Sequence, residues 1–95
     1  MEDEKVYHVS VDSAANDRMA EHFDFLSRVS ENAAIRLLDE LLAGIRTLEK
    51  TPYQNPIFDR PYLPPGKYRH LIISKRYRIV YQIDGNFVYV DDIQQ

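Results

Sequence analysis

Residues 68–83 of this 95-residue chain combine arginines with apolar residues at a spacing that suits recognition of a charged partner. Two runs rich in β-branched and aromatic residues flank the basic bend at residues 74–76 and predict a β-hairpin. Guanidinium groups pair with carboxylates or phosphates, so the hairpin predicts a surface for an acidic peptide or for RNA. The face expected to carry this chemistry holds Arg69, Leu71, Ile73, Arg78, Val80 and Gln82, with Lys75 and Arg76 at the bend.

The apolar centre of that face needs a cover, because exposed sheet faces rarely place Leu71, Ile73 and Val80 side by side. Either a partner covers them or the segment 51–66 folds across. All five prolines lie in this segment, interleaved with aromatic and aliphatic residues, which predicts a loop packed against the domain. Basic residues on a hairpin also prevent edge-to-edge aggregation, so charge alone does not establish a binding site.

The sequence does not support metal, thiol or hydrolase catalysis. The chain has no cysteine, which excludes disulfides, zinc–thiolate sites and thiol catalysis. His8, His22 and His70 are far apart and lack a second ligand at a recognisable spacing, so we expect no metal site and no cofactor. His70 falls on the hairpin face assigned to the core. No nucleophile–base spacing, phosphate loop or carboxylate dyad indicates a hydrolase.

The elements that must position the hairpin can be read from hydrophobic spacing. Residues 5–11 alternate as a strand, and residues 13–29 and 31–50 show helical spacing with N-cap residues before each. The short link between these helices requires an antiparallel αα-hairpin. Gly44 is expected to allow close packing against the first helix, or simply to lower stability.

A turn at residues 84–86 and an apolar run at residues 87–93 complete the pattern. The predicted order is β-α-α-β-β-β, an α+β fold in which a helical hairpin packs on a small twisted antiparallel sheet. Ninety-five residues at 44% hydrophobic form one domain, residues 1–95, without room for a large catalytic cavity.

Charge and hydropathy bound the location and the partners. The net charge of −3 is uneven: residues 1–50 carry six Lys/Arg and eleven Asp/Glu (−5), and residues 51–95 carry six and four (+2). The negative net charge of the chain argues against general nucleic-acid binding. The acidic residues 1–5 precede no apolar run, and no stretch approaches the ~20 apolar residues of a membrane span, so we expect a cytoplasmic protein.

The element order, with Tyr-Arg-Ile-Val-Tyr at residues 77–81 and Leu-Glu-Lys-Thr-Pro at residues 48–52, resembles the RelE/ParE superfamily of toxins from type II toxin–antitoxin modules. The resemblance spans residues 6–93. It implies the helical hairpin on a twisted sheet described above. It also implies neutralisation by an antitoxin encoded beside the toxin, whose C-terminal segment is expected to cover the face around Leu71, Ile73 and Val80.

The superfamily splits by target: RelE-like members cleave mRNA in the ribosome, whereas ParE-like members inhibit DNA gyrase and are not nucleases. By resemblance, Arg78 matches an arginine that holds the scissile phosphate, and Arg69 matches a lysine on the preceding strand. These two would be the catalytic residues of a ribonuclease. Leu71 stands where the nucleases place a lysine as general base, and leucine cannot take a proton. Their C-terminal basic and tyrosine positions have no counterpart before Gln95, a pattern that a shortened chain would also give.

The prediction is therefore a ParE-like toxin of the plasmid-stabilisation type, more a binding protein than an enzyme, which inhibits growth through DNA gyrase. One alternative is a ribosome-dependent mRNA endoribonuclease that uses Arg69 and Arg78; another is a degenerate toxin that only binds antitoxin. Expected partners are the cognate antitoxin, gyrase (or the ribosome and mRNA), and a second copy of the chain paired through exposed strands. No membrane contact is expected.

Overall fold

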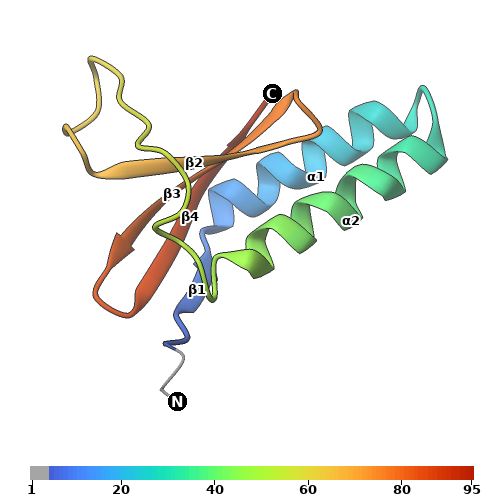
Figure 1. The fold of residues 1–95 in the computed structure, drawn as a ribbon. Coiled ribbons are helices and arrows are strands. Elements are labelled where there is room, and N and C mark those ends of the chain that lie inside the picture. Colours follow the sequence, from blue (N-terminus) through green and yellow to red (C-terminus); the bar gives the residue numbers. More distant parts are fainter. Residues whose placement is uncertain (1–4) are drawn as a thin grey trace.

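The computed structural model of the protein describes residues 5–95; the rest of the acidic start, residues 1–4, lies outside the described part. The predicted α+β order is confirmed (Figure 1). The elements are β1 His8–Val11, α1 Ser13–Ser27, α2 Glu31–Thr47, β2 Tyr68–Ile73, β3 Tyr77–Asp84 and β4 Phe87–Gln94.

The four strands form one sheet in the order β1-β4-β3-β2. The β2–β3 and β3–β4 pairs are antiparallel, as expected, while β1 lies parallel to β4, so the sheet is mixed. A parallel pair needs a long connection, and both helices and two strands lie between β1 and β4 in the chain. Residue Asp91 has no partner in β3, and this bulge bends the last part of β4.

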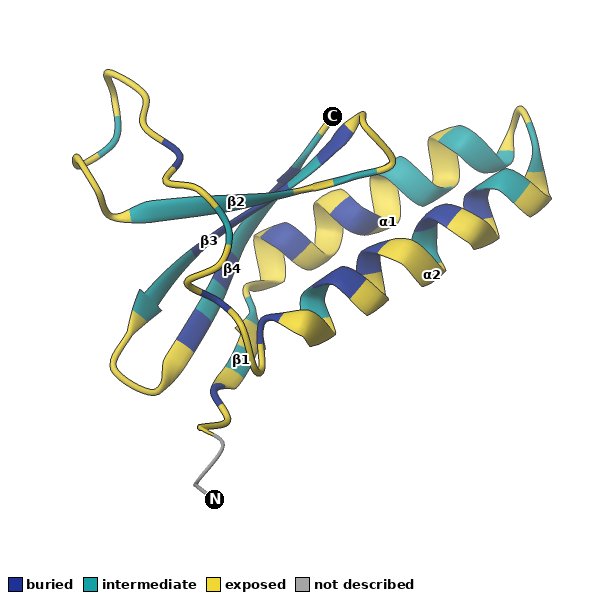
Figure 2. Ribbon diagram, in the orientation of Figure 1, coloured by how far each residue is buried: buried dark blue, intermediate teal, exposed yellow. Residues whose placement is uncertain are grey.

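Both helices begin at the predicted caps. The Asp12 carboxylate accepts a hydrogen bond from the Ala14 N–H at 3.1 Å, and Ser30 Oγ accepts one from the Ala33 N–H at 3.2 Å. The helices pack against each other and against one face of the sheet (Figures 1 and 2). The main core contains apolar side chains from both layers: Tyr7, Ala15, Met19, Leu37, Leu41, Leu48, Tyr77, Ile79, Tyr81, Val88, Val90 and Ile93.

Gly44 marks a close approach of α2 to the sheet rather than to α1. A Cβ atom at this position would lie 2.7 Å from Cδ1 of Ile73, with Leu71 at 3.2 Å and Ile79 at 3.3 Å. The glycine therefore lets α2 lie directly on β2 and β3. The expected close packing of Gly44 against the first helix was therefore wrong, because its close neighbours belong to the sheet.

The register of the β2–β3 hairpin corrects one sequence expectation. Three residues connect the strands, so Ile73 pairs with Tyr77 and Leu71 pairs with Ile79. Directly opposed residues point to the same face, which places Leu71 and Ile73 beside the core beneath α2. The grouping of Arg69, Leu71 and Ile73 with Arg78, Val80 and Gln82 on one face was wrong. A connection with one residue more or fewer would have produced that grouping.

Candidate functional site

The sheet face turned away from the helices is the candidate binding face. From β3 it receives Arg78, Val80 and Gln82, and from β2 it receives the residues paired with them: Ile72, His70 and Tyr68. The assignment of His70 to the core face was therefore also wrong. The cause is the same: with β2 shifted by one residue against β3, Leu71 and Ile73 are predicted on this face and His70 on the opposite one.

The proline-rich segment folds across this face, which is one of the two covers considered from the sequence. Residues 56–58 pair with the edge of β2: the Phe58 N–H donates to the Tyr68 carbonyl at 2.8 Å, and the His70 N–H donates to the Pro56 carbonyl at 3.1 Å. Phe58 is only 2% exposed and Val80 only 4%, and neither belongs to the main core cluster. Both are therefore buried outside the main core, on the face of the sheet turned away from the helices.

The start of the same loop is held from the helix side of the sheet. Tyr81 donates from its hydroxyl to the Pro52 carbonyl at 2.5 Å and accepts from Asn55 Nδ2 at 3.0 Å. Arg69 donates to the carbonyls of Tyr53 (3.2 Å) and Asn55 (2.6 Å). Arg69 is thus a loop anchor, and its guanidinium is committed to backbone oxygens rather than offered to a ligand.

Two arginines besides Arg69 lie next to the Phe58 ring. The guanidinium carbon of Arg60 lies 4.2 Å from the centre of the Phe58 ring, and that of Arg78 lies 4.8 Å from it. The His70 ring lies 5.0 Å from the same centre. We call Arg60, His70 and Arg78 around Phe58 the cationic cluster. Cation–π attraction explains why both guanidiniums are held beside this one buried ring.

His70 has a defined protonation pattern in this cluster. Arg78 donates from Nε to Nδ1 of His70 at 2.7 Å, and an arginine nitrogen cannot accept, so Nδ1 carries no proton. Burial lowers the pKa of His70, and the charges of Arg78 and Arg60 lower it further. Near neutral pH the ring is therefore neutral with its proton on Nε2. His70 presents a donor to its surroundings, and its basic nitrogen is occupied.

Within the described part of the chain, the arginines of the cluster lack an acidic partner. Among residues 5–95, neither Arg60 nor Arg78 lies within ion-pair distance of a carboxylate; the recorded pairs involve Arg18 and Arg28. Arg60 donates to the neighbouring Asp59 carbonyl, and Arg78 to His70. The terminal guanidinium groups thus retain free donors, and such a set of donors without acceptors favours an anion.

The other predicted binding residues lie in three different places. Gln82 donates to the Asp91 carboxylate at 2.6 Å. Burial raises the pKa of Tyr68, and the nearby Asp91 carboxylate, which accepts a hydrogen bond from the Tyr68 hydroxyl, raises it further. Lys75 and Arg76 are exposed in the hairpin turn, where the Ser74 hydroxyl hydrogen-bonds to Glu40 of α2. The structure thus brings Arg78, Val80 and Gln82 together, and separates them from Arg69, Leu71 and Ile73 by the thickness of the sheet.

Phe58 and Arg60 were missing from the predicted site, and His70 was placed on the wrong face. The apolar content of the proline-rich segment indicated that it packs on the domain, but nothing in its pattern specified which strand it pairs with. Arg60 therefore takes the place beside Arg78 that the sequence had suggested for Arg69.

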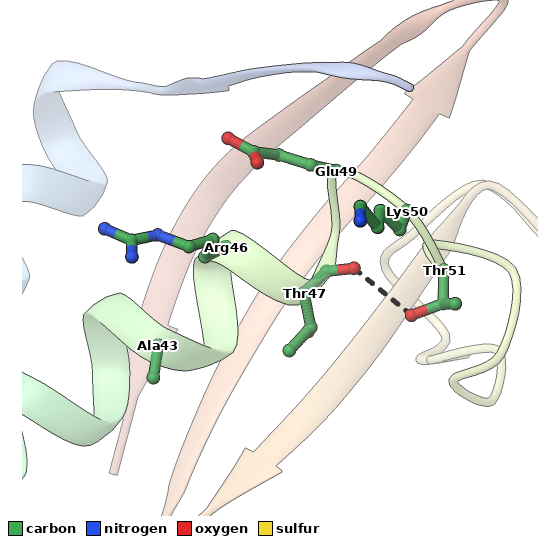
Figure 3. Close-up of a pocket in the computed structure, with 6 residues that line it drawn as sticks. All are labelled: Ala43, Arg46, Thr47, Glu49, Lys50 and Thr51. Atoms are coloured by element: carbon green, nitrogen blue, oxygen red, sulfur yellow. Dashed lines mark hydrogen bonds between the residues drawn. The ribbon is translucent and has the colours of Figure 1, made fainter. Parts of the chain in front are cut away.

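A separate shallow hollow of about 510 Å³ lies where α2 ends (Figure 3). It is lined by Ala43, Arg46, Thr47, Glu49, Lys50 and Thr51. The hydrogen bond across it, from Thr51 Oγ1 to the Thr47 carbonyl at 3.2 Å, closes the helix end. The charged ends of Arg46, Glu49 and Lys50 do not converge on one point (Figure 3), so we assign no site there.

Within residues 5–95, no group of three or more acidic or histidine side chains is arranged to hold a metal ion. None of the helices described is long and apolar enough to cross a membrane.

The fold matches that of a known toxin–antitoxin protein. The chain superimposes on a chain from the chromosomal ParDE toxin–antitoxin system of P. aeruginosa with a TM-score of 0.75, over 96% of this chain and 97% of the other, at 14% identity. That likeness establishes the architecture. No protein of curated function matches the chain.

The family follows from the sequence match. The family described as the ParE toxin of the type II toxin–antitoxin system parDE matches residues 9–94. The chain belongs to this family. The resemblance read from the sequence is confirmed, on the ParE side of the superfamily.

Proposed function

We propose that this chain is the toxin of a type II toxin–antitoxin module that arrests growth by binding DNA gyrase, without cutting RNA. A cognate antitoxin encoded beside it would neutralise it by binding, and both would act in the cytoplasm, where gyrase works. Membership of the ParE family supports the toxin class and an antitoxin partner. Gyrase as the target, and neutralisation itself, are the proposed part.

The observation that supports binding, rather than RNA cleavage, is the protonation state of His70 in the cationic cluster. Cleavage of RNA through its 2′-hydroxyl needs a group that removes a proton. Among residues 5–95, the base in direct contact with Arg78 is His70, and its unprotonated nitrogen already accepts the Arg78 Nε–H. Leu71 packs beneath α2, and Arg69 holds the loop. The cluster is equipped to hold an anion, and it holds no free base.

A ribonuclease remains the second candidate because Arg60 and Arg78 have the free donors that a phosphate would need. That candidate would use Arg60 and Arg78, rather than Arg69 and Arg78, for phosphate contacts. It would still need a base supplied by the ribosome or by a rearranged His70.

The test is controlled expression in a bacterial host of the wild-type chain, Arg78→Ala and the matched charge control Arg28→Ala. Growth, plasmid supercoiling and mRNA integrity are followed in the same cultures. We expect arrest by wild type and Arg28→Ala, altered supercoiling and intact mRNA. Arrest with mRNA cut inside reading frames, and abolished by Arg78→Ala, would support the nuclease instead. Absence of arrest by all three would leave a degenerate toxin.

Neutralisation is tested by co-expressing the neighbouring antitoxin gene, which should restore growth. A homodimer paired through the edge of β2 is not part of the proposal, because residues 56–58 already occupy the first half of that edge.

A further inference from the structure

We propose that the cationic cluster is a carboxylate-binding site that receives an acidic side chain of an extended peptide. The inference rests on the proposed function, since the antitoxin is the partner that would supply the peptide. It adds the chemistry of recognition and the residues responsible, Arg60, His70 and Arg78.

The first support is the supply of unused donors. Arg78 uses Nε for His70 and Arg60 uses one terminal nitrogen for a carbonyl, which leaves terminal N–H groups on both guanidiniums. His70 adds its Nε2–H, because Nδ1 is the acceptor in the bond from Arg78. Charge-assisted hydrogen bonds to a carboxylate are the strongest that such groups make.

The second support is preorganisation. The buried Phe58 ring holds both guanidiniums by cation–π contact, and the Arg78–His70 bond fixes the imidazole. An anion would therefore meet donors whose positions are already set, which reduces the entropy lost on binding. The ring also forms an apolar wall that excludes water from one side of the site.

The third support concerns the kind of anion. The face that carries Arg78 also carries Asp91, which accepts hydrogen bonds from Gln82 and Tyr68 and has no ion pair within residues 5–95, whereas Asp92, opposite Val80, is paired with Arg18 at 3.6 Å. The Asp91 carboxylate would repel the successive phosphates of a nucleic acid. A single carboxylate on a neutral backbone fits a cluster of two arginines with an acidic neighbour.

The fourth support is the open edge beside the cluster. Residues 56–58 bond only to the Tyr68 carbonyl and the His70 N–H, so the pairing stops before Ile72. The outward N–H and carbonyl of Ile72 have no backbone partner among residues 5–95, and its side chain is 46% exposed. An extended peptide can add hydrogen bonds there while its apolar side chain covers Ile72 and its carboxylate reaches Arg78.

The experiment is an NMR titration of the full chain that follows the His70 ring and the Arg78 Nε–H. The probe is the tripeptide leucine–glutamine–glutamate, blocked at both ends, against its leucine–glutamine–glutamine counterpart at constant ionic strength. We expect saturable shifts at both residues with the glutamate peptide alone. Arg60→Gln should weaken binding about fivefold to tenfold, and the matched charge control Arg28→Gln should leave it unchanged.

Absence of a saturable shift, or equal weakening by Arg60→Gln and Arg28→Gln, overturns the proposal. Tighter binding of a single-stranded RNA hexamer than of the glutamate peptide also overturns it, in favour of a nucleic-acid site. Affinity for the neighbouring antitoxin, measured with the same variants, separates the two proposals. Growth arrest relieved by antitoxin, with affinity insensitive to Arg60→Gln, sinks the carboxylate site and leaves the toxin function intact. Saturable binding of the glutamate peptide without growth arrest would support the carboxylate site and contradict the proposed toxin function.

Discussion

Arg78 and His70 are diagonal neighbours on adjacent strands, joined by a 2.7 Å hydrogen bond from Nε of the arginine to Nδ1 of the histidine. The bond decides which ring nitrogen of His70 carries a proton, and with it the chemistry of the open sheet face. A base with its lone pair turned outward would suit cleavage. A ring whose remaining nitrogen is a donor suits anion binding, which is the arrangement found.

The stability of the protein should depend on pH through His70. The pKa of His70 is lowered in the folded state, so the unfolded chain binds more protons as pH falls below about 6.5, the ordinary histidine value. The contribution is fully present above pH 6.5 and declines as pH falls through that value toward the folded pKa. Urea unfolding of wild type and His70→Asn between pH 8 and pH 5 tests this.

Asparagine keeps an acceptor near the position of Nδ1 without titrating, so His70→Asn should lose less stability than wild type over that range. His8 and His22 remain in both proteins and provide the common background. Parallel pH profiles for the two proteins would contradict the assignment.

Phe58→Ala should destabilise the protein by about 3 kcal/mol, because the substitution removes a fully buried ring and leaves a cavity. It should also release Arg60 and Arg78 from their common support. Denaturant unfolding measures the first effect. Tyr62→Ala in the same loop is the control: its ring is 74% exposed, and we expect less than about 0.5 kcal/mol. Similar losses for both variants would mean that the loop does not seal the sheet face.

Gly44→Ala should destabilise the protein although alanine is the better helix former by about 1 kcal/mol. The new methyl would lie 2.7 Å from Ile73 Cδ1, which forces α2 away from the sheet or Ile73 into another rotamer. Overpacking of this kind costs about 1–3 kcal/mol. Ala43→Gly, one residue earlier on the exposed side of α2, measures the helix propensity alone. A gain in thermal stability for Gly44→Ala would refute the close approach.

Lys75→Gly should stabilise the β2–β3 turn by roughly 1 kcal/mol. Ser74 and Lys75 have positive φ angles of 53° and 64°, a conformation that costs side-chain-bearing residues energy and glycine little. Arg76→Gly is the matched control because Arg76 has no positive φ, and we expect a small loss there. Thermal unfolding of both variants gives the comparison, and a loss for Lys75→Gly would show that the lysine side chain compensates for the strain.

Local sequence patterns determined the elements and their order. Apolar spacing located the two helices, Asp12 and Ser30 marked their starts, and the short link expected at residues 29–31 left only an antiparallel hairpin. In the structure the link is residues 28–30. Alternation in residues 5–11 predicted a strand, and its apolar residues Tyr7, Val9 and Val11 lie in or against the core. These features depend on interactions between residues close in the chain, so the sequence contains them directly.

The composition of the binding face was decided by the tertiary structure. Which face receives Leu71 or His70 depends on whether the β2–β3 connection has an odd or even number of residues, and the basic bend fits either count. The position of Arg60 beside Arg78 depends on the pairing of residues 56–58 with β2, a contact over more than ten residues that no local pattern encodes. The sequence by itself determined that a ParE-like fold would present arginine on a sheet. Long-range pairing determined that Arg60 and Arg78 lie beside the same ring, that of Phe58. It also placed His70 where its Nδ1 accepts the bond from Arg78 and is not available as a base.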